Sequence, residues 1–205
     1  MSKGTLYIVT APSGCGKGTI LADAIEKHGF NFSVSATTRQ PREGEQEGVN
    51  YFFKTHEEFE KMIEEDAFLE YAEFCDNYYG TPREYVESML KEGKDVVLEI
   101  EVQGAMNVMK NMPEAISIFI LPPSIKELKR RLLKRATEDI EVVNQRTLQA
   151  RTEVPYAKYF DYVIVNDDLD DAVRDFDACV TAAKFSNKSH KNEIENKILE
   201  VLENE

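Results

Sequence analysis

The chain has 205 residues, with 25 lysines and arginines against 38 aspartates and glutamates, and a formal net charge of −13 at pH 7. This length allows one domain with appended subdomains and a buried core, and the acidic balance argues against nucleic acid as a partner. Although 42% of the residues are hydrophobic, no apolar run approaches the roughly 20 residues that cross a bilayer, so no membrane partner is predicted.

The three cysteines, Cys15, Cys75 and Cys179, are unevenly spaced along the chain. An odd and scattered set does not form a disulfide framework and is typical of a reducing compartment. The first strand is predicted to begin almost at once, without the pattern of a signal peptide. We therefore expect a cytoplasmic protein.

The first predicted element is a short strand at residues 6–9, which a glycine-rich segment and an amphipathic helix follow. The segment, here called the phosphate loop, consists of Ala11, Pro12, Ser13, Gly14, Cys15, Gly16, Lys17, Gly18 and Thr19. In this order the backbone N–H groups and the helix N-terminus can surround a phosphate whose charge Lys17 balances. The alternative is a glycine-rich turn that only happens to contain a lysine, and the flanking strand and helix disfavour it.

Two positions of the phosphate loop depart from the common pattern. Ala11 stands where the first glycine usually is, and Gly18 stands where Ser or Thr usually helps to hold Mg²⁺. Thr19 is the nearest hydroxyl, so we expect either Thr19 or water to take that place. The departures weaken the metal prediction and leave the phosphate prediction intact.

Strand and helix patterns then alternate. After the first helix, a strand is predicted at 32–35 and a polar loop at 36–50. Thr55 and Glu58 form a capping box that opens a helix. Residues 68–74 alternate aromatic and acidic side chains, as a half-buried strand does.

The middle of the chain continues in the same way. Thr81 and Glu84 form a second capping box, before a helix that ends near Gly93. Runs of β-branched residues predict strands at 96–102 and 116–121.

The last third is predicted to be mostly helical. A third capping box, from Ser124 to Glu127, begins a basic helix, and another helix covers about 140–151. The last strand is predicted at 162–165 and a long helix at 169–184, and the tail beyond it carries apolar residues at helical spacing.

Alternating strands and helices predict an α/β fold, with a parallel sheet and helices on both of its faces. The segment 36–92 lacks this alternation and has two strands of its own. We therefore predict an inserted subdomain there.

Charged residues gather at two further places. Arg39 and Arg42 lie three apart with Pro41 between them, which makes a rigid fork for a phosphate, although an exposed pair of surface salt bridges is the alternative. Glu99 and Glu101 lie on the same side of a predicted strand end, where they are either functional or merely solvated.

Three motifs together resemble the bacterial guanylate kinases, from about residue 4 to residue 184. They are the phosphate loop, the run Ser-Ala-Thr-Thr-Arg-Gln-Pro-Arg-Glu-Gly-Glu at 35–45, and Asn-Tyr-Tyr-Gly at 77–80. The resemblance implies a fold of the P-loop NTPase type and a kinase that uses Mg²⁺. The implied reaction moves the γ-phosphoryl group of ATP to GMP, and to dGMP, to give ADP and GDP in purine nucleotide metabolism and GMP recycling.

The resemblance also implies a division of residues 1–184. The parts are a core (1–35, 93–124 and 160–184), a GMP-binding subdomain (36–92) and a lid (125–159). Residues 185–205 remain as a C-terminal tail, in which we expect a helix.

Carried over position by position, the resemblance assigns a set of residues to each nucleotide. The GMP set is Arg39, Arg42, Tyr51 and Tyr79 on the phosphate, Ser35, Glu70 and Thr81 on the guanine, and Glu99 and Glu101 near the metal. The ATP set is the phosphate loop with Arg131, Arg135, Arg146 and Asn166. The implied catalytic residues are Lys17, Arg39, Arg135 and Arg146. The candidate Mg²⁺ ligands are Thr19 and Glu99, the latter directly or through water, because the family often has Asp where Glu101 stands.

The chemistry of Glu70 suits guanine. A carboxylate can accept from both the N1–H and the N2 amine of guanine, whereas adenine would leave it unpaired. Thr81 has two interpretations, base contact and helix N-cap, and the sequence leaves both open.

Two other functions are alternatives. One is a guanylate-kinase-like module that binds proteins without catalysis, which the retained Lys17 and lid arginines disfavour. The other is a kinase for AMP, CMP or dTMP, which Glu70 together with Ser35 and Thr81 disfavours. A monomer and a homodimer both remain open.

Overall fold

The computed structural model describes residues 3–74, 76–134 and 140–203. Its strands are β1 (Leu6–Thr10), β2 (Asn31–Phe32), β3 (Ala36–Thr37), β4 (Phe52–Phe53), β5 (Phe68–Phe74), β6 (Asn77–Pro82), β7 (Val96–Glu99), β8 (Ile116–Leu121) and β9 (Tyr162–Val165). Its α-helices are α1 (Lys17–His28), α2 (His56–Glu64), α3 (Arg83–Lys91), α4 (Val102–Asn111), α5 (Ile125–Lys134), α6 (Ile140–Glu153), α7 (Leu169–Ala183) and α8 (Lys191–Glu203). A 3-10 helix, η1 (Val154–Tyr159), continues α6.

Five parallel strands form the central sheet, in the order β2-β7-β1-β8-β9. Side chains alternate between its faces: Tyr7 and Val9 pack with α1 and α7, whereas Leu6 and Ile8 pack with α3 and α4. The predicted parallel sheet with helices on both faces is therefore confirmed. Because β1 lies in the middle, the loop that follows it opens at the carboxyl edge of the sheet, where ligands bind in such folds.

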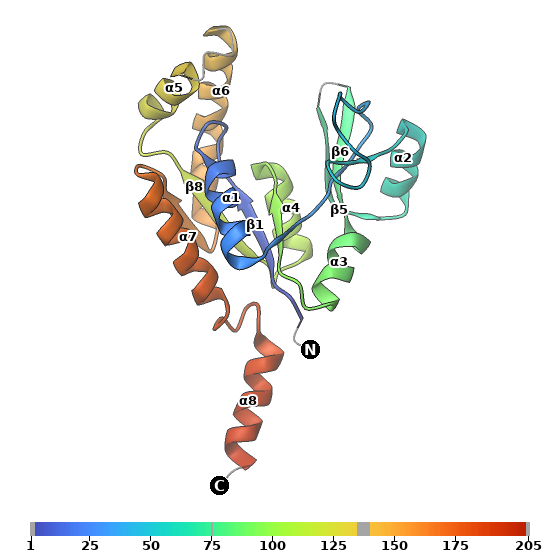
Figure 1. Cartoon of the computed structure of the whole chain (residues 1–205), viewed down its shortest axis with the longest axis vertical. Coiled ribbons are helices and arrows are strands. Elements are labelled where there is room, and N and C mark those ends of the chain that lie inside the picture. Colours follow the sequence, from blue (N-terminus) through green and yellow to red (C-terminus); the bar gives the residue numbers. More distant parts are fainter. Residues whose placement is uncertain (1–2, 75, 135–139, 204–205) are drawn as a thin grey trace.

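A second sheet, in the order β4-β3-β6-β5, forms within the segment 36–92. Helix α2 covers it through Phe59, whose ring stacks on Phe68 (centroids 4.4 Å apart) and on Tyr78 (5.2 Å). Figure 1 shows this sheet on one side of the central sheet and the pair α5 and α6 on the other side.

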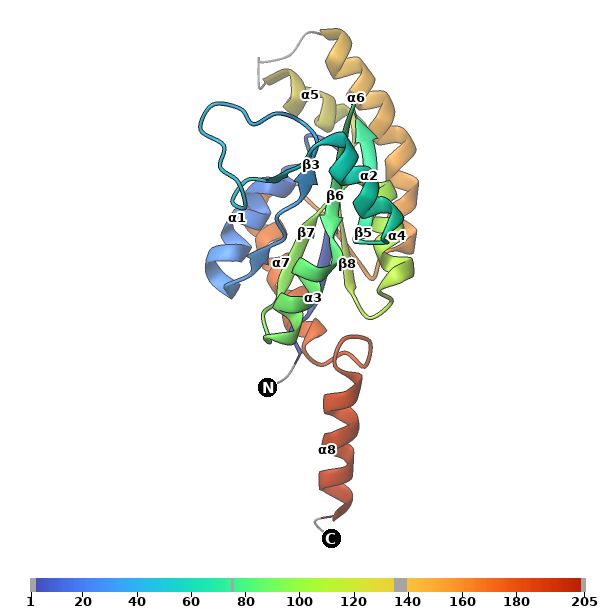
Figure 2. The same ribbon diagram turned by 90° about the vertical axis from the view of Figure 1, so that its right-hand side faces the viewer.

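The C-terminal helix α8 projects away from the rest of the molecule, as Figures 1 and 2 both show. The turn before it is held to the body, because the Lys188 ammonium pairs with Asp161 and the Ser189 hydroxyl donates to the Ala183 carbonyl. Within the described ranges, no helix is long and apolar enough to cross a membrane.

Several sequence predictions of secondary structure are confirmed, and others are wrong. The strands at 68–74, 116–121 and 162–165 form as predicted, and Thr55 and Glu58 form both bonds of the capping box. The strand predicted at 32–35 is wrong in extent, because β2 ends at Phe32. The strand predicted at 96–102 ends at Glu99, and the helix α4 begins three residues later.

Candidate functional site

The phosphate loop joins β1 to α1 and depends on two glycines. Gly14 and Gly16 have φ angles of 92° and 84°, in the left-handed region that other residues avoid. A Cβ at Gly14 would lie 2.7 Å from Leu132 of α5, and one at Gly16 would lie 2.5 Å from the Asn166 amide. Leu132 and Asn166 therefore pack closely against the loop and leave no room for a side chain at Gly14 or Gly16.

Asn166 supports the loop from beneath. Its buried side-chain amide donates to the Cys15 carbonyl at 2.6 Å. Because a trans peptide holds its C=O and N–H on opposite sides, this bond turns the N–H of Gly16 away from Asn166. The residue that resemblance assigned to ATP thus contacts the phosphate loop itself.

Arg131 in turn fixes the backbone around Asn166. Its guanidinium donates to the carbonyls of Asn166 (2.9 Å) and Asp167 (3.1 Å), and its Nε donates to Glu127 (2.9 Å). Hydrogen bonds from Arg130 and Arg131 lower the pKa of Glu127 to about 2. The capping box predicted at Ser124 is thus half formed: the Ser124 hydroxyl accepts from the Glu127 N–H, while the Glu127 carboxylate accepts from the arginines.

Lys17 is the first residue of α1 and lies where the loop meets the acidic pair. Its Nζ is 3.7 Å from Oε1 of Glu99, and its side chain is 17% exposed. Burial lowers the pKa of Lys17, and the nearby carboxylates of Glu99 and Glu101 oppose that shift. The ammonium is therefore held close to counter-charges in a partly dehydrated position.

Other predicted ATP residues that the structure describes lie around the same loop. Arg146, on α6, donates to the Ser13 hydroxyl at 3.1 Å. Thr19 and Gly18 are exposed in the first turn of α1. Arg135 lies outside the described residues.

Cys15 is buried in the middle of the loop. Burial raises the pKa of its thiol to about 12, so the group stays protonated at neutral pH. Its side chain acts as a small apolar filler beneath the loop.

A cavity of about 430 Å³, here called the acidic cavity, opens beside the loop. It is lined by Ser35, Tyr51, Glu70, Ala72, Glu73, Tyr79, Gly80, Glu99, Ile100, Glu101, Gln103 and Gly104. A smaller cavity of about 160 Å³ shares Ser35, Tyr51 and Glu99 with it and adds Thr81. The fold thus gathers seven of the predicted GMP residues, which are 66 positions apart at the extremes of Ser35 and Glu101.

Thr10 fixes the segment that carries the two acids. Its buried hydroxyl donates to the Ile100 carbonyl at 2.6 Å, between Glu99 at the end of β7 and Glu101 at the N-cap of α4. The acidic pair is therefore held against the strand from which the phosphate loop emerges.

Arg39 is oriented by a carboxylate and an aromatic ring. Its Nη2 donates to both carboxylate oxygens of Glu45, at 2.8 and 3.0 Å, and its guanidinium lies 5.4 Å from the centre of the Tyr51 ring. The Tyr51 and Tyr79 rings meet edge to face, 6.2 Å apart. Glu45 also accepts from the backbone N–H of the exposed Arg42, at 2.8 Å.

Glu45 was part of the motif at 35–45 but was given no role by sequence reasoning. Its hydrogen bonds from Arg39 and from the Arg42 backbone lower its pKa, so it stays ionised. The signal that could have found it is the Gly-Glu that ends the motif, since Gly44 has a φ of 87° and turns the chain back toward Arg39.

Glu70 and Thr81 face each other on β5 and β6. The Thr81 hydroxyl donates to Glu70 at 2.6 Å, and Thr81 is buried. Burial raises the pKa of Glu70, and the bond from Thr81 opposes that shift. Helix α3 has Pro82 at its N-cap without a side-chain cap bond, so the capping interpretation of Thr81 was wrong.

Glu153, at the end of α6, was not predicted from the sequence. Its carboxylate accepts a hydrogen bond from Gln149 at 2.7 Å. Burial raises the pKa of Glu153 and repulsion from Glu101 adds to the rise, whereas the bond from Gln149 and the Lys17 ammonium oppose it. Its place beside the Lys17 site depends on how α6 packs, and no local motif marks it.

In the described part of the chain, no three His, Cys, Asp or Glu side chains group around a common point. The side chains there therefore do not favour a metal centre formed by the protein alone. Glu99 and Glu101 are instead close to Lys17 and to the phosphate loop. A hard cation held mostly by nucleotide phosphates, with one or two carboxylates and water, fits such an arrangement.

Comparison with known proteins gives a consistent result. The guanylate kinase family profile matches residues 3–183. The chain is 52% identical over 183 residues to the guanylate kinase of Caldanaerobacter subterraneus subsp. tengcongensis, with 89% of each sequence covered. It is 50% identical over 182 residues to that of Thermus thermophilus, covering 89% of this chain and 83% of the relative.

A solved structure agrees with these sequences. The crystal structure of guanylate kinase from Anaplasma phagocytophilum superimposes with a TM-score of 0.69 at 32% identity, covering 92% of this chain and 90% of that one. The family profile, the relatives and the solved structure all agree, and this chain belongs to the guanylate kinase family.

Proposed function

We propose that this protein transfers the γ-phosphoryl group of ATP to GMP, and more slowly to dGMP, to give ADP and GDP or dGDP. The observation that carries the proposal is the 3.7 Å contact between Lys17 and Glu99, because it joins the phosphate loop to the acidic cavity. Two nucleotide phosphates bound on either side of this contact would meet there. Such an enzyme would serve purine nucleotide metabolism and GMP recycling in the cytoplasm, where the buried Cys15 thiol would stay reduced.

We assign the ATP phosphates to the phosphate-loop amides and Lys17, with Arg146 and Arg131 beside them and Arg135 from the proposed lid at 125–159. Two observations support this: Arg146 already reaches Ser13, and Arg131 braces the loop through Asn166. Arginines that close on a transferring phosphoryl group stabilise its developing charge, and closure excludes water.

We assign GMP to the acidic cavity, in the proposed subdomain at 36–92 and its border with the core. Arg39 and Arg42, with Tyr51 and Tyr79, would hold the phosphate, and Ser35, Glu70 and Thr81 would select guanine. The preformed Arg39–Glu45 and Glu70–Thr81 bonds support these roles, because they hold the donors and acceptors in place before GMP binds.

Mg²⁺ would bind together with ATP, near Glu99, Glu101 and Thr19, and would neutralise phosphate charge. No general base is required, because the phosphate dianion of GMP is already a nucleophile. The residues of this chain therefore act by positioning the two phosphates and by excluding water.

The test is ADP release from ATP with each monophosphate in turn. We expect turnover with GMP, slower turnover with dGMP, and at least a hundredfold lower kcat/KM with AMP, CMP or dTMP, because an unpaired buried carboxylate rejects the wrong base by roughly that factor. Turnover with none of them would favour a module that binds proteins. Sedimentation of the full chain would decide between a monomer and a homodimer.

A further inference from the structure

Glu70 lies where the second sheet meets the core. Its neighbour Leu69 is 1% exposed and packs in the core cluster that contains Val102, Ala105 and Val108 of α4. This end of β5 is therefore anchored to α4, and Glu70 is held at the border of the core.

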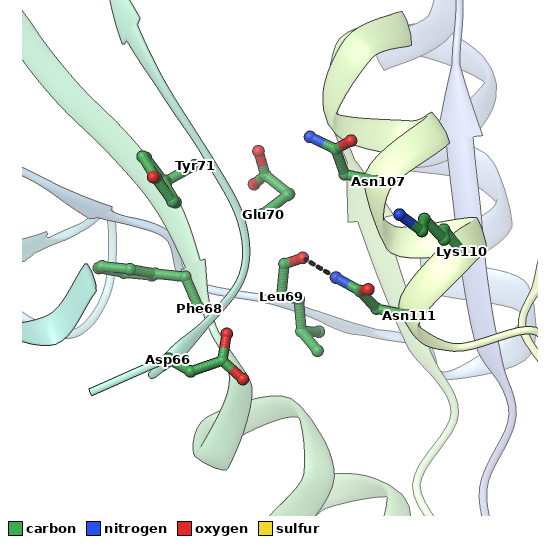
Figure 3. A pocket seen from close by; sticks show the side chains of 8 residues that line it. All are labelled: Asp66, Phe68, Leu69, Glu70, Tyr71, Asn107, Lys110 and Asn111. Carbon is green, nitrogen blue, oxygen red and sulfur yellow. Dashed lines mark hydrogen bonds between the residues drawn. The ribbon is translucent and has the colours of Figure 1, made fainter. Parts of the chain in front are cut away.

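A second tether lies farther along the same helix. Figure 3 shows Glu70 on β5 facing α4, with Asn107 across from it, and the Asn111 amide donating to the Leu69 carbonyl at 3.4 Å. The packing of Leu69 and this bond set the distance between β5 and α4. The space left for the Glu70 carboxylate is therefore fixed by what α4 presents at its first turn.

The residue that α4 presents there is Gly104, which has no side chain. A Cβ at Gly104 would lie 2.8 Å from Oε2 of Glu70, 3.3 Å from its Cδ and 3.5 Å from its Cγ. A real Cβ does not come within 3 Å of such an atom, so the whole carboxyl group would have to move away from the helix. The other oxygen, Oε1, is held at 2.6 Å by the buried Thr81, which does not follow such a movement easily.

From this geometry we infer that Gly104 is a positioning residue for base selection. The missing side chain at 104 lets α4 press against the Glu70 carboxylate while Thr81 holds it from the other side. This inference rests on the proposed function, because it gives Glu70 the role of reading guanine. It adds that the core helix α4, and not only the second sheet, determines which base is accepted.

A substitution at Gly104 should affect stability and selectivity differently. The group that would collide is the end of a side chain, so the fold can tolerate an added methyl, and alanine favours a helix more than glycine does. Gly104→Ala should therefore fold with an unchanged or higher melting temperature. Its defect should appear in the choice of acceptor.

The experiment compares GMP with IMP, which lacks the N2 amine, in wild type, Gly104→Ala and the control Lys110→Ala. Lys110 is exposed on the same helix. We expect Gly104→Ala to lower kcat/KM for GMP by about tenfold, to change that for IMP much less, and to leave KM for ATP unchanged. The control should keep the GMP to IMP ratio of the wild type.

A second pair of variants tests the contact itself. Glu70→Asp retracts the carboxylate by one methylene and should remove the collision, so adding Gly104→Ala to Glu70→Asp should cost less than twofold. An unchanged GMP to IMP ratio in Gly104→Ala, or the same tenfold loss in both backgrounds, would overturn the inference while the proposed function stands. A wild type without preference for GMP would overturn both.

Discussion

The phosphate loop and the acidic cavity differ in how the sequence specifies them. The phosphate loop is nine consecutive residues, whereas the acidic cavity is lined by residues of β5, β6, β7 and α4 and of the connecting segments. Even the loop is not self-sufficient, because Asn166 reaches it from 151 residues away. The residues of the phosphate loop thus set the path of its backbone, and a distant residue, Asn166, holds that backbone in the conformation expected to bind phosphate.

The largest expected effect belongs to the local region. Lys17→Ala removes the only charge that the loop itself carries, and should lower kcat by roughly 10³-fold while KM for GMP changes little. Steady-state kinetics with both substrates varied would measure this. A rise in KM for GMP with kcat retained would show that Lys17 belongs to the acceptor side.

The next prediction concerns whether the phosphate loop needs the hydrogen bond from Asn166. Asn166→Asp replaces the donor to the Cys15 carbonyl with a carboxylate, which repels that oxygen, and should raise KM for ATP by roughly 10–100-fold. Asn144→Asp, at an exposed position of α6, makes the same chemical change away from the loop and should be close to wild type. Equal kinetics for the two variants would mean that the loop holds its shape alone.

A smaller effect is expected in the cavity. Glu45→Gln weakens the two-oxygen grip on Arg39 and should raise KM for GMP by about tenfold, with kcat at saturating GMP mostly kept. Glu43→Gln removes a charge two residues earlier, at an exposed position, and serves as the matched control. If both variants lose affinity for GMP equally, then GMP binding depends on the overall charge of the segment 35–45 and not on the orientation of Arg39.

The smallest effect concerns pH. Burial raises the pKa of Glu70, and guanine requires the ionised form, so affinity for GMP should fall as the pH decreases through that raised pKa. At a pH equal to the pKa, the apparent KM should be about twofold higher than at neutral pH. The phosphate of GMP titrates in every variant, so the difference between the profiles of wild type and Glu70→Gln isolates this carboxyl. Parallel profiles would contradict the prediction.

The predictions that the structure confirms depend on local signals in the sequence. Short stretches of sequence were enough to predict the strand at 68–74 and the capping box at Thr55. The same holds for the strand and the helix that flank the phosphate loop. The helix α4 was not predicted, because Val102 continues a β-branched run and Gly104 weakens the helical pattern.

The sequence identified candidate residues of the site, but it did not predict the contacts between them. Which oxygen Thr81 contacts, and whether it caps a helix, depends on the register between β5 and β6. The roles of Glu45 and Glu153 depend on partners that only folding brings together. Pairings of this kind have no local pattern, so only the structure reveals them.

The bond between Asn166 and Cys15 also has a consequence for how the protein is made. A ribosome releases the phosphate loop among the first residues, but the amide that supports it emerges only after β9, near the end of the fold. Until Asn166 has been synthesised, the phosphate loop lacks the hydrogen bond that supports it. The central strand β1 then also lacks part of its sheet. ATP in the cell can therefore protect the finished enzyme from unfolding, but it gives a growing chain no such help.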